Sequence, residues 1–428
     1  MPATLTERIL EAHIAGREGD LLHVRYDHLL LHDATGALLV DRFRALGRPP
    51  AHPGRILAAA DHFVPPASAE RAEILQKYLD FTAGLPGIRN RPFDGICHQL
   101  LVEDPATGPG QFIIGADSHT VTAGALGALA TGLGSTDILF AMAAGWTWMA
   151  PPEVRRLVLE GRRGPWIRGK DAALAVLRRT GPAPAGADLA YECVDRCEPP
   201  LSMDSRFSLA CMGAEMGAAF FLMVPDAVTR AYVEAKGGRW PESPLAPEAD
   251  AAYHGELTVP LPGRPLVAVP PAPWHVEPVD ALAGVRIHQA FIGSCTGGRI
   301  EDLADAARLL RGRRVAPGVR LVVIPASRAV YQEALEAGYL SDIVAAGGMV
   351  GIPSCGPCGG IDKGILGRGQ VMVATSNRNF PGRTGRGETY LASAPVVAAS
   401  AVAGRIAAPE EVAPDGPRRG APGRRPGT

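Results

Sequence analysis

Three cysteines have the spacing of an incomplete metal site. Cys295 stands alone in the segment FIGSCTGGR, whereas Cys355 and Cys358 are separated by two residues in SCGPCGG. Three thiolates are one ligand short of a closed tetrahedral zinc site or a fully ligated cubane iron–sulfur cluster. A metal with one open position can bind a substrate directly and act as a Lewis acid. The spacing leaves two alternatives open, which are a structural zinc site completed by Cys193 or Cys197 and a set of buried thiols.

Carboxylates and imidazoles follow several short apolar segments. Asp61 and His62 close the segment GRILAAADH, and His98 lies in GICHQ, while the segment FIIGA runs into the triplet Asp117, Ser118 and His119. An imidazole held by a carboxylate can be kept charged and aimed as a general acid. A helix cap or a buried structural histidine would explain one such pair. Sheets of α/β proteins place their ligands at strand ends, so several such termini suggest one shared site.

Two arginines and one glutamate complete the candidate site. Arg378 and Arg383 follow the apolar segment QVMVATS in a loop that also contains Asn377. Guanidinium groups bind carboxylates in a bidentate manner, although a surface pair is the alternative in an arginine-rich chain. Glu215 lies four residues after Cys211 in a segment rich in alanine, glycine and methionine. A single glutamate in so apolar a segment is unlike a solvated surface residue. This favours a functional role for Glu215 or a buried ion pair.

Strands and helices must alternate to position these residues. The pattern predicts strands in residues 21–31 and 111–116, amphipathic helices at the N-terminus and in 69–85, and a strand–helix–strand–helix run over 285–340. This order is typical of an α/β fold. The glycine-rich segment 123–137 lacks the lysine of a phosphate-binding loop, so we interpret it as tight packing beside a cofactor.

We divide the chain into three α/β subdomains and a tail. The predicted boundaries are 1–165, 166–280 and 281–408, with a disordered tail at 409–428. Residues 181–192 and the proline-rich run 261–278 are interpreted as linkers.

Composition narrows the class of protein. The chain has 428 residues, 46% of them hydrophobic, and a net charge of −1, which argues against a nucleic-acid surface. Seven cysteines, an odd number, and an N-terminus unlike a signal peptide predict a soluble protein of the reducing cytoplasm. The most apolar stretch, 138–151, is too short to span a bilayer.

Taken together, these motifs resemble the aconitase superfamily, most closely the branch of 3-isopropylmalate dehydratase and homoaconitase large subunits. The resemblance covers roughly residues 5–408. The matching segments, in chain order, are HDATGALLVDRF, DHFVPP, CHQ, GADSHTVTAGALGALATGLGSTD, CMGAEMGAA, FIGSCTGGRIEDL, VIPASRAVY, SCGPCGG, SNRNFPGR and YLASAPVVAASAVAG.

The resemblance implies a fold and a set of residue roles. The fold would be aconitase-like, with three α/β/α subdomains around an iron–sulfur cluster and without the swivel domain. Cys295, Cys355 and Cys358 would hold a [4Fe-4S] cluster with one iron open to substrate. His62 would be the general acid. The remaining catalytic set would be Asp61, Asp117, His119, His98 and Glu215, and the substrate-binding set Arg378, Arg383, Ser118 and Asn377.

The implied activity is that of a hydro-lyase acting on a hydroxy di- or tricarboxylic acid. Isomerisation of 3-isopropylmalate and 2-isopropylmalate in leucine biosynthesis is the leading hypothesis. Homoaconitase-like, dimethylmalate dehydratase-like and specialised-metabolism activities are the alternatives, and a cluster-sensing RNA-binding protein or a degenerate structural partner are the non-enzyme alternatives. The family's serine-bearing Gly-Ser-Ser-Arg-Glu-His loop does not occur in the sequence, so the resemblance implies a separate swivel-type small subunit.

Several positions depart from the family pattern, among them the family's Thr-Gly-Gly run, which is replaced by GADLAYECVDRCEPP. The family has asparagine where Cys211 stands and where Gly297 follows the motif GSCT. The turn after the last cysteine is also altered, and contains Asp362. We expect such changes to affect the surroundings of a cluster or the choice of substrate.

Overall fold

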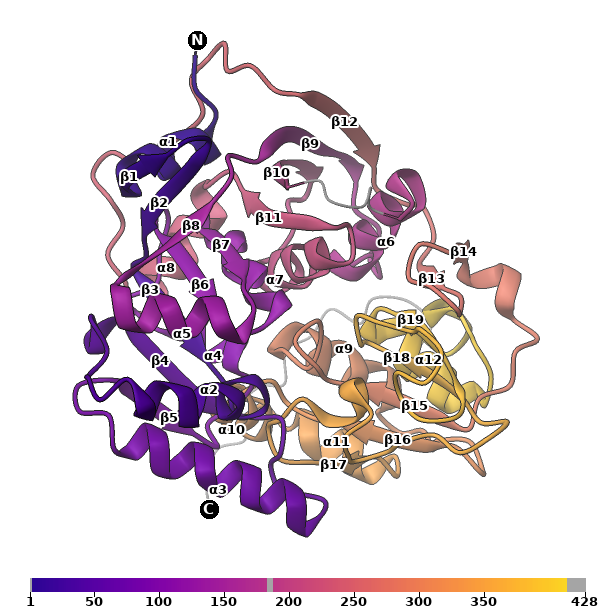
Figure 1. The fold of residues 1–428 in the computed structure, drawn as a ribbon. Helices are drawn as coiled ribbons and strands as arrows, with labels where there is room; N and C mark the ends of the chain where they lie inside the picture. The colour runs from indigo at the N-terminus through magenta and orange to yellow at the C-terminus, as the bar shows by residue number, and fades with distance from the viewer. Residues whose placement is uncertain (1, 183–187, 414–428) are drawn as a thin grey trace, which may run out of the picture.

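The first subdomain is built on a parallel sheet that carries half of the candidate site. The computed structural model describes residues 2–182 and 188–413, and Figure 1 shows their arrangement. The five strands lie in the order β5-β4-β3-β6-β7. They are β3 (His28–Leu31), β4 (Ile56–Ala60), β5 (Arg89–Pro92), β6 (Phe112–Gly115) and β7 (Leu129–Gly132). Strands β3, β4 and β6 are fully buried, as expected for a parallel sheet covered on both faces.

Helices cover this sheet, and a small antiparallel sheet lies beside it. The helices are α1 (Leu5–His13), α2 (Asp33–Ala45), α3 (Ala69–Ala83), α4 (Cys97–Glu103) and α5 (Ser135–Ala144). The antiparallel strands are β1 (Ile14–Glu18), β2 (Leu21–Arg25) and β8 (Trp146–Met149). Helix α1 begins with a capping box in which Thr4 and Glu7 satisfy each other's backbone amides.

The second subdomain has a four-stranded parallel sheet in the order β11-β10-β9-β12. Its strands are β9 (Glu153–Arg162), β10 (Leu189–Glu198), β11 (Ala218–Met223) and β12 (Gly255–Pro260). Its helices are α6 (Gly169–Thr180), α7 (Met203–Cys211) and α8 (Ala227–Ala235), and a 3₁₀ turn, η3 (Met212–Ala214), directly continues α7. The buried Arg206 of α7 pairs with Asp195 at 2.9 Å and Asp226 at 2.6 Å, which fixes this helix against the sheet.

The third subdomain has a seven-stranded sheet in the order β14-β13-β19-β18-β15-β16-β17. Five strands are parallel, and β13 and β14 add an antiparallel edge. The strands are β13 (Leu266–Ala268), β14 (Val276–Pro278), β15 (Gln289–Ile292), β16 (Arg320–Val323), β17 (Met349–Val350), β18 (Val371–Ala374) and β19 (Glu388–Ala392). The helices are α9 (Ile300–Leu310), α10 (Arg328–Glu336), α11 (Tyr339–Ala345) and α12 (Ala394–Ala403).

The predicted boundaries cut through two of these sheets. The boundary at 165 places β9 in the first subdomain, although β9 pairs with β10 along its whole length. The boundary at 280 and the linker at 261–278 separate β13 and β14 from the third sheet, although β13 pairs with β19. The proline-rich run is therefore an edge hairpin, where missing amide donors cost little.

Two further segments differ from the sequence predictions. The strand predicted over 21–31 is two strands in different sheets, because the chain turns at Asp27, whose carboxylate accepts hydrogen bonds from the amide of Phe112 and the ring of His13. Pro409–Glu411, assigned to the tail, form a 3₁₀ turn, and the rest of the predicted disordered tail, 414–428, lies outside the described residues. Part of the predicted linker 181–192, residues 183–187, also lies outside them. None of the helices in the described ranges has the length and apolarity needed to cross a membrane.

The glycine-rich segment packs backbone against backbone between the first two sheets. It begins with the 3₁₀ helix η2 (Ser118–Leu126) and continues into β7. A Cβ atom at Gly124 would overlap the carbonyl oxygen of Phe221 in β11. Only glycine allows this close approach, which holds η2 and the site residues at its start against the second sheet.

We predict that Gly124→Ala destabilises the protein by at least about 1–3 kcal/mol, because the methyl group overpacks against backbone that has no rotamer to change. Gly108→Ala is the matched control, since a Cβ there meets no atom within 4 Å. Chemical unfolding of both variants measures the difference. Equal stability of the two variants would contradict the packing role of Gly124.

Candidate active site and metal centre

The polar residues singled out in the sequence meet where the three subdomains face one another. One pocket is lined by Asp61, His62, Ile96, His98, Asp117, His119, Cys295, Cys355, Cys358, Asn377, Arg378 and Arg383. Most of them come from segments that directly follow the strands β4, β6, β15 and β18. The carboxyl ends of parallel strands thus point at a common centre, as the α/β pattern predicts.

Asp61 and His62 form a tight pair at the end of β4. His62 Nδ1 lies 2.8 Å from Asp61 Oδ1. Burial lowers the pKa of His62, but the charge and hydrogen bond of Asp61 outweigh it and raise that pKa to about 10. Asp33 fixes the turn by accepting backbone hydrogen bonds from Asp61, His62 and Phe63 at 2.7–3.0 Å. The imidazole is therefore a charged proton donor at neutral pH.

Asp117 is shared by two histidines at the end of β6. Its Oδ1 lies 2.9 Å from His98 Nε2 and 3.3 Å from His119 Nδ1, and it caps η2 by accepting the His119 amide. Burial alone would raise the pKa of Asp117, but the charge of His98 and the hydrogen bonds of both histidines lower it well below its usual range. Asp117 therefore stays charged and orients both rings.

The three predicted metal-ligating cysteines face the same pocket. Cys295 follows β15 through Gly293 and Ser294, and the φ of +71° at Ser294 is a strained, left-handed conformation for a residue other than glycine. The Asn377 amide lies between the two cysteine segments, 3.1 Å from Cys295 Sγ and 3.0 Å from Cys358 Sγ. The hydrogen bond of Cys355 lowers the pKa of the Cys358 thiol well below its usual range, although burial opposes this effect. A depressed thiol pKa favours the thiolate that a metal requires.

Several buried polar atoms in and next to this pocket have no hydrogen-bond partner among the residues that the structure describes. They belong to residues of the pocket and its wall and are His98 Nδ1, Glu215 Oε2, Ser376 Oγ, Arg383 Nε and both side-chain polar atoms of Asn379. Buried polar groups in native proteins are almost always hydrogen-bonded, so such a concentration marks a place where a ligand belongs. Three convergent thiols together with these atoms fit a thiolate-ligated cofactor and a polar substrate.

Arg378 and Glu215 connect the arginine loop with the histidines. Glu215 Oε1 lies 2.8 Å from Arg378 Nε and 3.1 Å from His119 Nε2. Arg378 Nη2 donates to Ser118 Oγ at 3.0 Å. The buried ion pair expected for Glu215 is thus present, and it aims the Arg378 guanidinium along the pocket wall.

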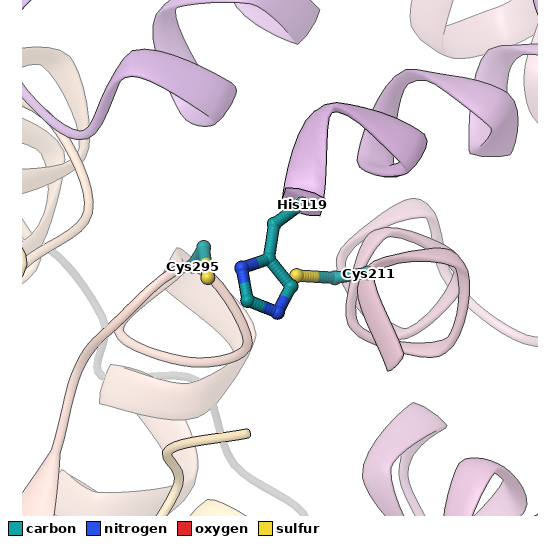
Figure 2. Close-up of side chains that lie close together, drawn as sticks. All are labelled: His119, Cys211 and Cys295. Carbon is teal, nitrogen blue, oxygen red and sulfur yellow. The ribbon is translucent and has the colours of Figure 1, made fainter. Parts of the chain in front are cut away.

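The structure brings all thirteen predicted site residues into this one region. Ser118 and Glu215 are joined to it by the contacts with Arg378, and the other eleven line the pocket. Cys193 and Cys197, the alternative zinc ligands, instead lie in β10 and do not line it. The additional cysteine that reaches the centre is Cys211, which lies with Cys295 and His119 in a cluster of ligand atoms within 4.8 Å (Figure 2).

Several residues near the centre were not predicted. His32 stacks on His62 with ring centroids 4.3 Å apart, and both His32 and Asp33 lie in the quoted motif HDATG, which offered a signal. Arg299 is 1% exposed and donates to the carbonyl oxygen of Cys295 at 2.8 Å. Lys170 is buried in α6 and donates to the carbonyl oxygen of Ser376 at 2.8 Å. Burial lowers the pKa of Lys170 to about 8. The sequence around Lys170 resembles an ordinary first helical turn, so it gave no signal of this position.

Two of the departures from the family pattern are accommodated by their neighbours. At Gly297 a Cβ atom would lie 2.6 Å from Thr375 Cβ, so Thr375 occupies the space that a larger residue would need. Asp362 pairs with Lys363 at 2.6 Å, and Lys363 also donates to the carbonyl oxygen of Val64. The altered turn is therefore tied to the loop that follows His62.

Comparisons with known proteins agree with this geometry. The model of the aconitase family (aconitate hydratase) matches residues 7–257 and 271–404. The chain is 40% identical to a 3-isopropylmalate dehydratase large subunit from Aquifex aeolicus, covering 96% of this chain and 98% of the relative. It is 41% identical to one from Moorella thermoacetica, covering 96% and 100%. The crystal structure of Thermococcus kodakaraensis aconitase X in its holo-form has a TM-score of 0.50 at 14% identity, covering 83% of this chain and 84% of that one, and supports the fold alone.

We predict that Asp61→Asn lowers the pKa of His62 by roughly 1–3 units from about 10, because the nearest negative charge is removed. His62 then loses its proton at lower pH than in the parent, whose imidazole stays charged until the pH rises through about 10. Side-chain nitrogen NMR of the cluster-free protein over a pH series measures the shift. The exposed Asp80→Asn on α3 is the control, and an unchanged His62 titration in Asp61→Asn would contradict the pairing.

Proposed function

This chain belongs to the aconitase family, and from that membership we propose that it is the large subunit of a hydro-lyase that interconverts 3-isopropylmalate and 2-isopropylmalate. The observation that carries the proposal is the meeting of three thiols, two Asp–His arrangements and two arginines in one buried pocket. Relatives named 3-isopropylmalate dehydratase large subunit, alike over nearly their whole length, support this substrate.

We propose that Cys295, Cys355 and Cys358 hold a [4Fe-4S] cluster. The hydrogen bond that Asn377 Nδ2 donates to Cys295 Sγ and the lowered pKa of Cys358 support thiolate ligation there. When bound, the cluster supplies a Lewis acid that stabilises the hydroxyl oxygen leaving the substrate. Arg299, held beneath Cys295 by its bond to the Cys295 carbonyl oxygen, keeps the backbone of this ligand in place.

His62 is proposed to give its proton to the leaving hydroxyl. Its Nδ1 contacts Asp61, so Nε2 is the nitrogen available to a substrate in the pocket. The raised pKa keeps the proton on the ring until it is needed, and Asp61 stabilises the charge. Asp117 would orient His98 and His119 around the same oxygen, and Glu215 would complete this hydrogen-bonding shell through His119.

The arginine loop is proposed to bind the substrate carboxylates. Arg378 is held by Glu215 and Ser118, while Arg383 lines the pocket with a buried Nε that has no partner in the described residues. A bidentate carboxylate would satisfy that donor. Asn377 contacts both His119 and the Cys295 sulfur, so it would fix the position of the substrate relative to the metal-ligating cysteines.

A separate small subunit is proposed to supply the base that removes the α-proton. The words "large subunit" in the names of the relatives support this partner. The expected assembly is a complex of both subunits closing over the pocket.

We predict that Cys358→Ser abolishes cluster assembly and activity, because two thiolates cannot hold the cluster in place. The measurements are the visible absorbance after anaerobic reconstitution with iron and sulfide, and the UV absorbance of the unsaturated diacid formed with a co-produced small subunit. Cys193→Ser, a buried cysteine of β10, is the matched control and should keep both signals. A parent protein that forms no cluster would contradict the proposal, and so would turnover of homocitrate or 2,3-dimethylmalate in place of 3-isopropylmalate.

We predict that Arg383→Lys raises KM for 3-isopropylmalate by roughly 10–100-fold, because a point charge replaces a fork that binds a carboxylate at two atoms. Steady-state kinetics of the reconstituted complex measure it. Arg386→Lys, three residues along the same loop and outside the pocket lining, is the control. An unchanged KM in Arg383→Lys would show that carboxylate binding lies elsewhere.

A further inference from the structure

A fourth cysteine, Cys211, faces the metal centre from the second subdomain. It is the last residue of α7 and has no exposed surface. Figure 2 shows its sulfur and that of Cys295 on either side of the His119 ring. One ligand atom from each of these three residues lies within 4.8 Å of the other two. Tetrahedral zinc sites bring their ligand atoms within such distances of one another, and two thiolates with one imidazole are typical zinc ligands.

The imidazole of His119 is already oriented as a metal ligand. Its Nδ1 lies 3.3 Å from Asp117 Oδ1, a contact that fixes the ring as carboxylates do behind metal-bound histidines. Its Nε2 and Cys295 Sγ both contact the amide nitrogen of Asn377, at 2.8 and 3.1 Å. Nε2 is therefore the nitrogen on the side of the sulfur.

Glu215 lies beside His119, with Oε1 3.1 Å from His119 Nε2, but it is not one of the three residues whose ligand atoms all lie within 4.8 Å of one another. It follows Cys211 by four residues, and the helical backbone continues through η3, with the Met216 amide bonded to the Met212 carbonyl oxygen. The Glu215 side chain is 1% exposed, and its Oε2 has no hydrogen-bond partner in the described residues.

We propose that the cluster-free chain binds a single Zn²⁺ ion through Cys211, Cys295 and His119, with a water molecule as the fourth ligand. The two thiols release one proton each to solvent on binding, and a proton on the His119 nitrogen that binds the ion is released as well, with no oxidation or reduction. The ion with two thiolates and a neutral imidazole carries no net charge, and Lys170 and Arg378 lie near its ligands without being needed to balance it. Lys170 Nζ lies 3.4 Å from Met212 Sδ, next to Cys211, and Arg378 Nε contacts Glu215.

This zinc site goes beyond the proposed function. While zinc occupies the site, the chain cannot hold the cluster that the proposed function needs. Cys295 belongs to both ligand sets, and one thiolate cannot hold a zinc ion here and an iron of the cluster at the same time. Zinc would therefore hold the cluster-free chain in a state that cannot take up a cluster. The asparagine of the family at position 211 offers no thiolate, so this competing site depends on Cys211.

Zinc binding to the reduced, cluster-free full chain tests the proposal. Titration against a chromogenic chelator gives the affinity, and X-ray absorption of the zinc-loaded protein counts its sulfur ligands. We expect two sulfur and two nitrogen or oxygen ligands. Cys211→Asn should weaken binding by at least roughly 10-fold, since even loss of an outer-shell partner costs that much. Cys355→Ser and Cys193→Ser should bind as the parent does.

Reconstitution provides a second measurement. Zinc loaded beforehand should block cluster formation in the parent but not in Cys211→Asn, and a cluster formed by that variant without zinc shows that it folds. A count of three sulfur ligands would place the ion on the cluster cysteines and overturn the proposal. The same conclusion would follow if Cys355→Ser lost zinc binding while Cys211→Asn kept it. Failure of the parent to bind zinc would overturn it as well. A parent that forms no cluster would contradict the proposed function while leaving the zinc titration intact.

Discussion

The position of Asp61 is the constraint on which the rest of the site depends. One carboxylate oxygen holds His62 at 2.8 Å, and the other accepts the amide of Cys97 at 2.7 Å. Its carbonyl oxygen accepts the amide of Cys355 from the third subdomain at 2.9 Å. A single buried residue thus joins His62, the helix that carries His98 and the cysteine loop. Removing one partner from such a buried charged pair costs about 3–5 kcal/mol, so the pocket and the subdomain contact are energetically linked.

Close backbone packing makes this convergence possible. Each polar residue lies just beyond a buried strand, so the strands themselves must approach one another before the side chains can meet. Glycines allow this at Gly132, where a Cβ would lie 2.6 Å from the Cα of Ser118, and at Gly95, where it would lie 2.6 Å from the Cα of Ser327. The second contact joins the first and third subdomains. At these two positions glycine is therefore required by the close approach of the backbones.

The sequence predicted which residues would lie close together better than it predicted the contacts that these residues make. Strand-end placement was enough to bring Asp61, Asp117, Cys295 and Arg378 together, because parallel strands impose a common edge. The role of Lys170 could not be foreseen, since its burial arises only when α6 meets the loop of Ser376, two hundred residues away in sequence. The subdomain boundaries failed for a related reason. Pairing of β13 with β19 is a long-range contact, and a proline-rich run carries no local signal of an edge strand.

Three of the departures from the family pattern differ in what surrounds them. Gly297 is matched by the volume of Thr375, and Asp362 is neutralised by Lys363, so both changes are absorbed within their own subdomain. Cys211 has no such compensation. Its hydrogen bond, together with burial, raises the pKa of the Cys295 thiol, so it acts directly on a proposed cluster ligand. A packing change can be neutral for chemistry, but an added thiol beside a ligating thiol changes which metals the centre can hold. Among these three departures, Cys211 is therefore the one that changes the chemistry of the site, because it adds a soft ligand from the second subdomain, which otherwise reaches the site through Glu215.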